Sequence, residues 1–158
     1  MIDHLTLTVR DIQRSKAFYR AALAPLGCDV RMEFEQMCGI GPKGKPAFWL
    51  KQGEPPTQPM HIAFVADRGG VDGFHAAALA AGASDNGAPG LRLDYHPHYY
   101  AAFVIDPDGH NLEAVCHADP HAAPKPAARP VRTAARGRAR RAAPRKAAKK
   151  ARKGARRR

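Results

Sequence analysis

The chain has 158 residues and a formal net charge of +12. Residues 119–158 hold 16 Lys and Arg and one acidic residue, which leaves ten basic and 13 acidic residues for 1–118. All Phe, Tyr and Trp residues also fall in 1–118. The sequence therefore predicts one folded domain over 1–118 and a disordered tail over 119–158, because the tail has too little apolar surface to offset chain entropy.

Several classes of protein are excluded by the same sequence. No run of 18 apolar residues occurs, so no membrane partner is expected. The first residues lack the basic and apolar segments of a secretory signal. Cys28, Cys38 and Cys116 are odd in number and form no CxxC pair, which favours a reducing compartment. We expect a cytoplasmic protein.

The first half of the domain predicts one strand, one helix and three short strands. Leu5 to Val9 alternate apolar and polar residues, which is the period of a strand. Phe18, Ala22 and Leu26 then recur at helical spacing. The expected elements are a strand over 2–9, a helix from the Asp11 N-cap to Pro25 and Gly27, and strands over 28–34, 37–41 and 47–50.

The second half repeats this plan after a Pro-rich linker at 53–59. His4 precedes Phe18 by 14 positions and His61 precedes Phe74 by 13, and both histidines open an apolar strand. The expected elements are a strand over 60–65, a helix over 71–82, a Gly-, Asn- and Pro-rich loop over 84–90, and strands over 99–105 and 111–117 joined by a type I turn at 106–109. These halves predict an α+β domain of paired βαβββ modules, about 1–53 and about 59–118.

Matched positions of a repeat meet near its pseudo-twofold axis, and His4 and His61 are one such pair. Glu113 lies in an otherwise apolar strand, where a lone carboxylate is costly to bury, and Trp49 occupies the matching place in the first half. Two His and a carboxylate suit Fe, Mn, Ni or Zn as divalent ions. The alternative is two ordinary strand-edge histidines and a solvent-facing glutamate.

The segment from Tyr95 to Tyr100 is rich in aromatic and imidazole side chains. His96, His98 and Tyr100 are candidates for a pocket acid, base or substrate hydrogen-bond donor, because His titrates near neutral pH and Tyr donates well. The equally weighted alternative is a surface loop with aromatic anchors.

Three stretches of the chain carry a resemblance when they are taken together: Asp3 to Asp11 with Phe18-Tyr19, His61 to Phe64, and Asp106 to Glu113. As a set they resemble the vicinal oxygen chelate superfamily, which includes glyoxalase I, extradiol dioxygenases, fosfomycin-resistance thiol transferases and bleomycin-binding proteins. The resemblance covers about 1–117 and implies a cupped mixed sheet around a divalent metal, with ligands at His4, His61 and Glu113.

The branches of this superfamily differ at positions that can be compared with this chain. Trp49 stands where glyoxalase I has its fourth ligand, and Phe103 stands where the dioxygenase and fosfomycin-resistance branches have a Tyr. The resemblance to the latter branch makes Thr6 a residue that helps to activate a thiol. We do not assign one branch's reaction. The expected catalytic residues are Thr6, His96 and Tyr100, and Trp49, His98 and Phe103 are expected to line the substrate pocket.

From 124 to 158 the chain is dominated by Ala, Pro, Lys and Arg, and it resembles the tails of linker histones and bacterial histone-like proteins. Such a segment predicts non-specific contact with nucleic acid, because it has no aromatic residue to stack on bases. The alternative is an extension without a partner.

Two functions follow from the sequence. The first is a divalent-metal-dependent enzyme of lyase, transferase or dioxygenase type, acting on a small substrate that chelates the metal through oxygens. The second is a metal-free module of the same fold that binds or sequesters a small molecule and is tethered to nucleic acid by its tail. A second copy of the chain, as a homodimer, is the other partner that we consider.

Overall fold

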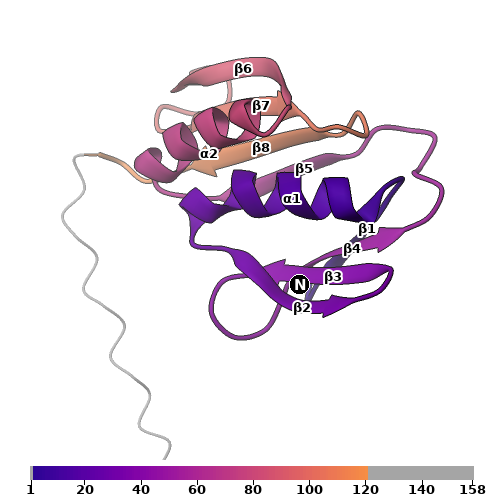
Figure 1. Ribbon diagram of the computed structural model, residues 1–158. Helices are drawn as coiled ribbons and strands as arrows, with labels where there is room; N and C mark the ends of the chain where they lie inside the picture. The colour runs from indigo at the N-terminus through magenta and orange to yellow at the C-terminus, as the bar shows by residue number, and fades with distance from the viewer. Residues whose placement is uncertain (1, 121–158) are drawn as a thin grey trace, which may run out of the picture. The chain divides into compact units, whose positions relative to one another are not determined.

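A computed structural model describes residues 2–120 of the chain. Nearly all of the predicted basic tail, and with it the predicted nucleic-acid contact, lies outside these residues. The described part forms two four-stranded sheets, each with a helix packed on one face (Figure 1). Among the described residues, no helix combines the length and the apolar character that a membrane span requires.

The first module contains one sheet with the strand order β1-β4-β3-β2. Strands β1 and β4 run parallel, and the other pairs are antiparallel. Its elements are β1 (Leu5–Val9), α1 (Ile12–Leu23), the short 3-10 helix η1 (Ala24–Leu26), β2 (Asp29–Phe34), β3 (Met37–Gly41) and β4 (Phe48–Gln52).

The second module repeats this topology, with the strand order β5-β8-β7-β6 and a parallel β5–β8 pair. Its elements are β5 (His61–Val65), α2 (Arg68–Ala80), β6 (Ser84–Leu91), β7 (Tyr100–Ile105) and β8 (Asn111–Cys116). The predicted fold class, a pair of βαβββ modules, is confirmed.

Both helices begin at an aspartate that follows the first strand of its module. The Asp11 carboxylate accepts hydrogen bonds from two backbone N–H groups in the first turn of α1, at 2.9 and 3.1 Å. Asp67 accepts one from Gly70 N at 2.7 Å in α2. These caps satisfy backbone donors that have no partner within the helix.

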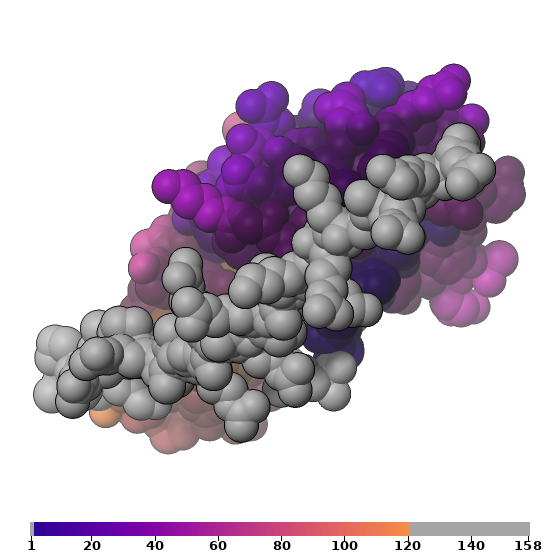
Figure 2. Space-filling model, turned by 90° about the horizontal axis from the view of Figure 1, so that it is seen from below, coloured from indigo at the N-terminus to yellow at the C-terminus, as the bar shows by residue number. Residues whose placement is uncertain are grey.

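One apolar core lies between the helices and the sheets and joins the two modules. The space-filling view shows the residues of both modules packed together as one body (Figure 2). Phe48 of β4 contacts Phe64 of β5 edge to face, with ring centroids 5.6 Å apart. Tyr19 of α1 donates a buried hydrogen bond of 2.6 Å to Asp106 in the turn before β8. Burial raises the pKa of Tyr19 well above its usual value, so the phenol keeps its proton.

The segment predicted as a loop over 84–90 is instead strand β6, and that prediction was wrong. β6 pairs antiparallel with β7, and its register shifts between Asp85 and Gly87 and again between Gly87 and Gly90. Gly87 has a φ of 149°, which a side chain would disfavour. Pairing with β7 therefore overrides a local composition that is poor in strand formers. The residues between the paired positions form bulges, which shift the register.

Ordered contacts also continue slightly past the predicted domain boundary at 118. His98 Nε2 lies 3.8 Å from a carboxylate oxygen of Asp119, so residues just beyond β8 contact the domain.

Candidate functional site

Glu113 occupies the middle of β8, which has strands on both sides. It stands opposite Ala63 of β5 and Phe103 of β7. Its neighbours Leu112 and Ala114 belong to the apolar core on which α2 packs, so the alternation of a strand directs Glu113 to the other face of the sheet. Its side chain is nevertheless only 2% exposed, which makes it a buried carboxylate that requires polar partners.

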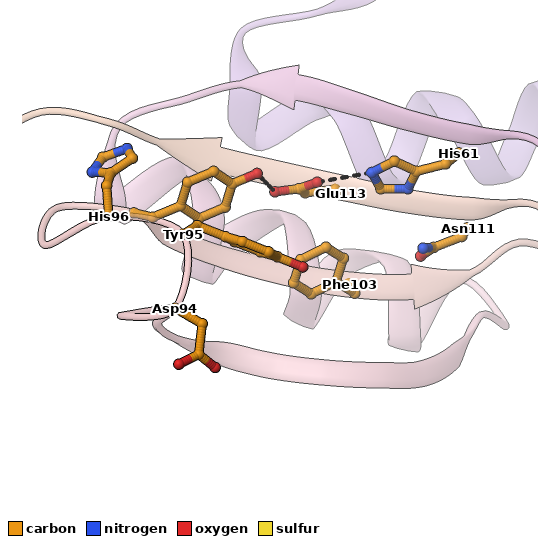
Figure 3. Close-up of a pocket in the computed structure, with 8 residues that line it drawn as sticks. His61, Asp94, Tyr95, His96, Phe103, Asn111 and Glu113 are labelled. Atoms are coloured by element: carbon orange, nitrogen blue, oxygen red, sulfur yellow. Dashed lines mark hydrogen bonds and ion pairs between the residues drawn. The ribbon is translucent and has the colours of Figure 1, made fainter.

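Both oxygens of Glu113 have a hydrogen-bond donor. Tyr99 OH donates to Oε1 at 2.6 Å. His61 Nε2 donates to Oε2 at 3.0 Å, and Figure 3 shows His61 and Glu113 turned toward one another. The His61 side chain is 52% exposed, so the imidazole joins the buried carboxylate to solvent. The His61 ring also stacks on Phe103, at a centroid distance of 6.3 Å.

A pocket of about 700 Å³ opens over this network. It is large enough for a small organic molecule. Aromatic, imidazole and carboxylate side chains dominate its lining. The lining residues are His61, Asp94, Tyr95, His96, Tyr99, Phe103, Asn111 and Glu113.

His96, which lines the pocket, is held by hydrogen bonds at both ring nitrogens. His96 Nδ1 accepts from His98 N at 3.1 Å, so the proton of a neutral His96 ring sits on Nε2. His96 Nε2 in turn lies 2.8 Å from His117 Nδ1. Tyr99 packs edge-on against both rings. Its burial and its hydrogen bond to Glu113 raise the pKa of Tyr99 to about 12, which keeps the phenol protonated at neutral pH.

The residues predicted to form the pocket in the second module do not all face it. His96 and Phe103 line the pocket, and His98 is not among the lining residues. Tyr100 does not face it: its hydroxyl donates to Asp72 of α2 at 2.7 Å, and its ring stacks under the Arg68 guanidinium. The expected role of Tyr100 in the pocket is corrected accordingly, because Tyr100 and Tyr99 lie on opposite faces of the sheet.

The remaining predicted residues belong to the first module. His4 Nδ1 is 2.8 Å from its neighbour Asp3, and Thr6 pairs in register with Trp49. The Trp49 ring stacks on Phe34 at 6.5 Å. Within residues 2–120 no three His, Cys, Asp or Glu side chains come together as metal ligands. The expected meeting of His4 with His61 and Glu113 is therefore not formed within one chain.

Sequence reasoning missed Tyr99 and His117, although the strand period could have identified both. Tyr99 lies just before β7 and four residues before Phe103, and His117 lies just after β8 and four residues after Glu113. Continuing the strand alternation by one residue places each on the pocket face. The interaction between His96 and His117 spans 21 residues and has no local sequence signal.

The two donor atoms in the second module fit a divalent ion. Ligands with metal bonds of about 2.0–2.2 Å at a right angle lie about 3 Å apart. The separation between His61 Nε2 and Glu113 Oε2 is 3.0 Å, and one imidazole nitrogen with one carboxylate oxygen is a donor pair typical of Fe, Mn, Ni or Zn. In the absence of an ion, the same separation is that of a hydrogen bond.

Residues 1–114 match the model of the Glyoxalase/Bleomycin resistance protein/Dioxygenase superfamily. The chain therefore belongs to this superfamily. Among curated proteins, no significant match is found.

Solved structures of similar fold include a glyoxalase/bleomycin resistance protein from Albidiferax ferrireducens, at 28% identity and a TM-score of 0.60, over 72% of this chain and 95% of that one. The fosfomycin resistance protein FosX from Mesorhizobium loti matches at 20% identity and a TM-score of 0.57, over 73% and 90%. A FosX mutant from Listeria monocytogenes, in complex with Mn(II) and dihydroxypropylphosphonic acid, matches at 19% and 0.57, over 73% and 88%.

Proposed function

We propose that the protein is a divalent-metal-dependent enzyme that acts on a small substrate with two metal-binding oxygens. The observation that carries this proposal is the pairing of a buried carboxylate, Glu113, with the half-exposed imidazole of His61 at the floor of a pocket. Members of the superfamily commonly use divalent metals, and the FosX structure cited above contains Mn(II). The reaction is of lyase, transferase or dioxygenase type.

The third ligand in this proposal is His4 from a second copy of the chain. The His4 side chain is 54% exposed and its hydrogen bond is to the adjacent Asp3, so it can reach a partner's site. Val65 lies on the same face of β5 as His61 and is 82% exposed. A second copy would cover it. Proteins of this fold often form dimers.

The bound ion would supply Lewis-acid stabilisation of negative charge that develops on substrate oxygens. The chain's own residues have separate tasks. His61 would hold the ion through Nε2, with the proton of the neutral ring on Nδ1. His96 would act as an acid, a base or a hydrogen-bond donor to the substrate, and Phe103 would form an apolar wall of the pocket. Thr6 and Trp49 would come from the second copy together with His4.

Metal analysis of the full chain, purified without chelator, tests this proposal. We expect about one ion per chain, bound more tightly as pH rises because protons compete with the metal for its ligands. Calorimetry with Mn(II) should show binding that is lost in His61→Ala, Glu113→Gln and His4→Ala. His75→Ala is the matched control, since His75 pairs with Asp85 outside the pocket.

Wild-type protein that binds none of Fe(II), Mn(II), Ni(II) or Zn(II) would contradict the enzyme proposal. Loss of binding in the first two variants but not in His4→Ala would contradict only the role of His4 from a second copy as the third ligand.

A second function has its own support. Both oxygens of Glu113 already accept a hydrogen bond within the chain, so its burial does not require an ion. A metal-free module that binds a small hydrogen-bonding molecule in the 700 Å³ pocket is consistent with this network. Under this proposal the basic residues of 124–158 would tether the module to nucleic acid. Unchanged ligand binding after chelation would favour this function over the first.

A further inference from the structure

The bond between Tyr99 and Glu113 is short and selective. The phenol donates to Oε1 at 2.6 Å, whereas Oε2 faces His61 at 3.0 Å. Hydrogen bonds from a hydroxyl group to an ionised carboxylate are among the stronger ones in proteins. The two oxygens of Glu113 are therefore no longer equivalent: one is committed to Tyr99, and the other is turned toward the imidazole.

The surroundings of Tyr99 fix the phenol in this position. Its backbone N–H donates to His96 O at 3.0 Å, and its carbonyl accepts from Arg92 N at 2.8 Å. Its ring has three aromatic or imidazole neighbours in edge-on contact, with centroid distances of 4.8 Å to Tyr95, 5.3 Å to His96 and 4.9 Å to His117. These contacts on several sides hold the half-buried Tyr99 phenol beside the carboxylate.

We propose that Tyr99 is a positioning residue that holds Glu113 so that it offers only Oε2, on the His61 side, to a divalent cation. This inference rests on the proposed function. A carboxylate that binds through one oxygen occupies one coordination position instead of two, which leaves more positions for substrate oxygens. Partners of ligating side chains commonly control orientation in this manner.

The neighbouring tyrosine provides a matched control. Tyr100 makes a bond of similar length, 2.7 Å, to the carboxylate of Asp72, but on the face of the sheet that is covered by α2. Tyr99→Phe and Tyr100→Phe therefore remove the same atom and the same kind of bond from adjacent residues. Each keeps its ring, so the packing of the strand is preserved in both variants.

The test uses the full chain and its two variants, with Mn(II) binding followed by calorimetry and Co(II) binding by visible absorption. We expect Tyr99→Phe to weaken Mn(II) binding by about 10- to 100-fold. It should also change the position and intensity of the Co(II) d–d bands, which report the number and geometry of ligands. Tyr100→Phe should leave the affinity within about twofold and the bands unchanged, and melting curves show whether each variant is folded.

Wild-type affinity and wild-type bands in Tyr99→Phe would overturn this inference and leave the proposed function intact. Equal changes in the two variants would also overturn it, because the effect would then come from general loosening of β7. Wild-type protein that binds neither ion would overturn the proposed function and this inference together.

Discussion

The two sheets share a strand order but differ at their matched centres. In the first module Trp49 of β4 stands opposite Gly39 of β3, and in the second Glu113 of β8 stands opposite Phe103 of β7. A large residue faces a small one in the first pair, and a carboxylate lies beside an aromatic ring in the second. A repeated backbone can therefore keep its strand pairing in both modules while the hydrogen-bond network of Glu113 occurs in the second module alone.

The largest expected effect on stability comes from removing the Asp106 carboxylate, which links the two modules through Tyr19. This buried carboxylate accepts hydrogen bonds from Tyr19 OH, Asp108 N and His110 N, at 2.6, 2.9 and 2.7 Å. Asp106→Ala leaves all three donors without this acceptor and should lower the free energy of unfolding by about 3 kcal/mol or more. Urea unfolding measures the loss.

The exposed Asp85, which pairs with His75, is the control for Asp106. Asp85→Ala should lower the free energy of unfolding far less than Asp106→Ala, because solvent screens an exposed ion pair. Similar losses in the two variants would mean that Asp106 does not tie the modules together.

A smaller effect is expected at Gly39, which leaves room for the indole of the first module. A Cβ at this position would lie 2.9 Å from Trp49 Cζ3 and from two atoms of the Pro46 ring. Gly39→Ala should therefore destabilise the fold by about 1–3 kcal/mol through overpacking. Thermal and urea unfolding measure it, and Trp49 fluorescence should change at the same time.

Gly69→Ala in α2 serves as the comparison, since the nearest atom to its Cβ would be 3.6 Å away. That change should be neutral or stabilising by up to about 1 kcal/mol. A neutral Gly39→Ala would show that the Trp49 ring moves freely.

The smallest effect on stability is expected from removing the basic segment. A chain that ends at Pro120 loses all 16 Lys and Arg of the tail and retains the described residues. Its melting temperature should be nearly unchanged, while DNA retention at low salt should be lost, because 1–118 holds 13 acidic and ten basic residues. Equal DNA retention by both chains, or a large fall in melting temperature, would contradict the sequence-based account of the tail.

Much of the fold could be predicted because periodicity and caps are local signals. The strand from Leu5 to Val9 and the N-cap at Asp11 lie where the alternation and the polar side chain indicate. Strand β6 could not be predicted in this way. Its Gly, Asn and Pro residues favour a loop, and only pairing with β7, the next strand along the chain, makes them a strand.

The candidate site was predictable in part. The unusual carboxylate in β8 and the histidine that opens β5 identify Glu113 and His61, which lie together in the structure. The choice between Tyr99 and Tyr100 depends on the phase of β7, and adjacent residues of a strand face opposite sides. Whether His4 lies near His61 and Glu113 depends on how the two sheets pack against each other. The spacing of residues along the chain does not specify that packing.

The register shifts in β2 and β6 have a consequence for self-association. Each sheet has one irregular edge, β2 or β6, and one regular edge, β1 or β5. Bulged edges are poor templates for adding a strand from another molecule, and Pro89 further removes a backbone donor from β6. Edge-to-edge stacking into aggregates is therefore disfavoured on two sides of the domain, and ordered pairing between chains is directed to the edges that begin beside His4 and His61.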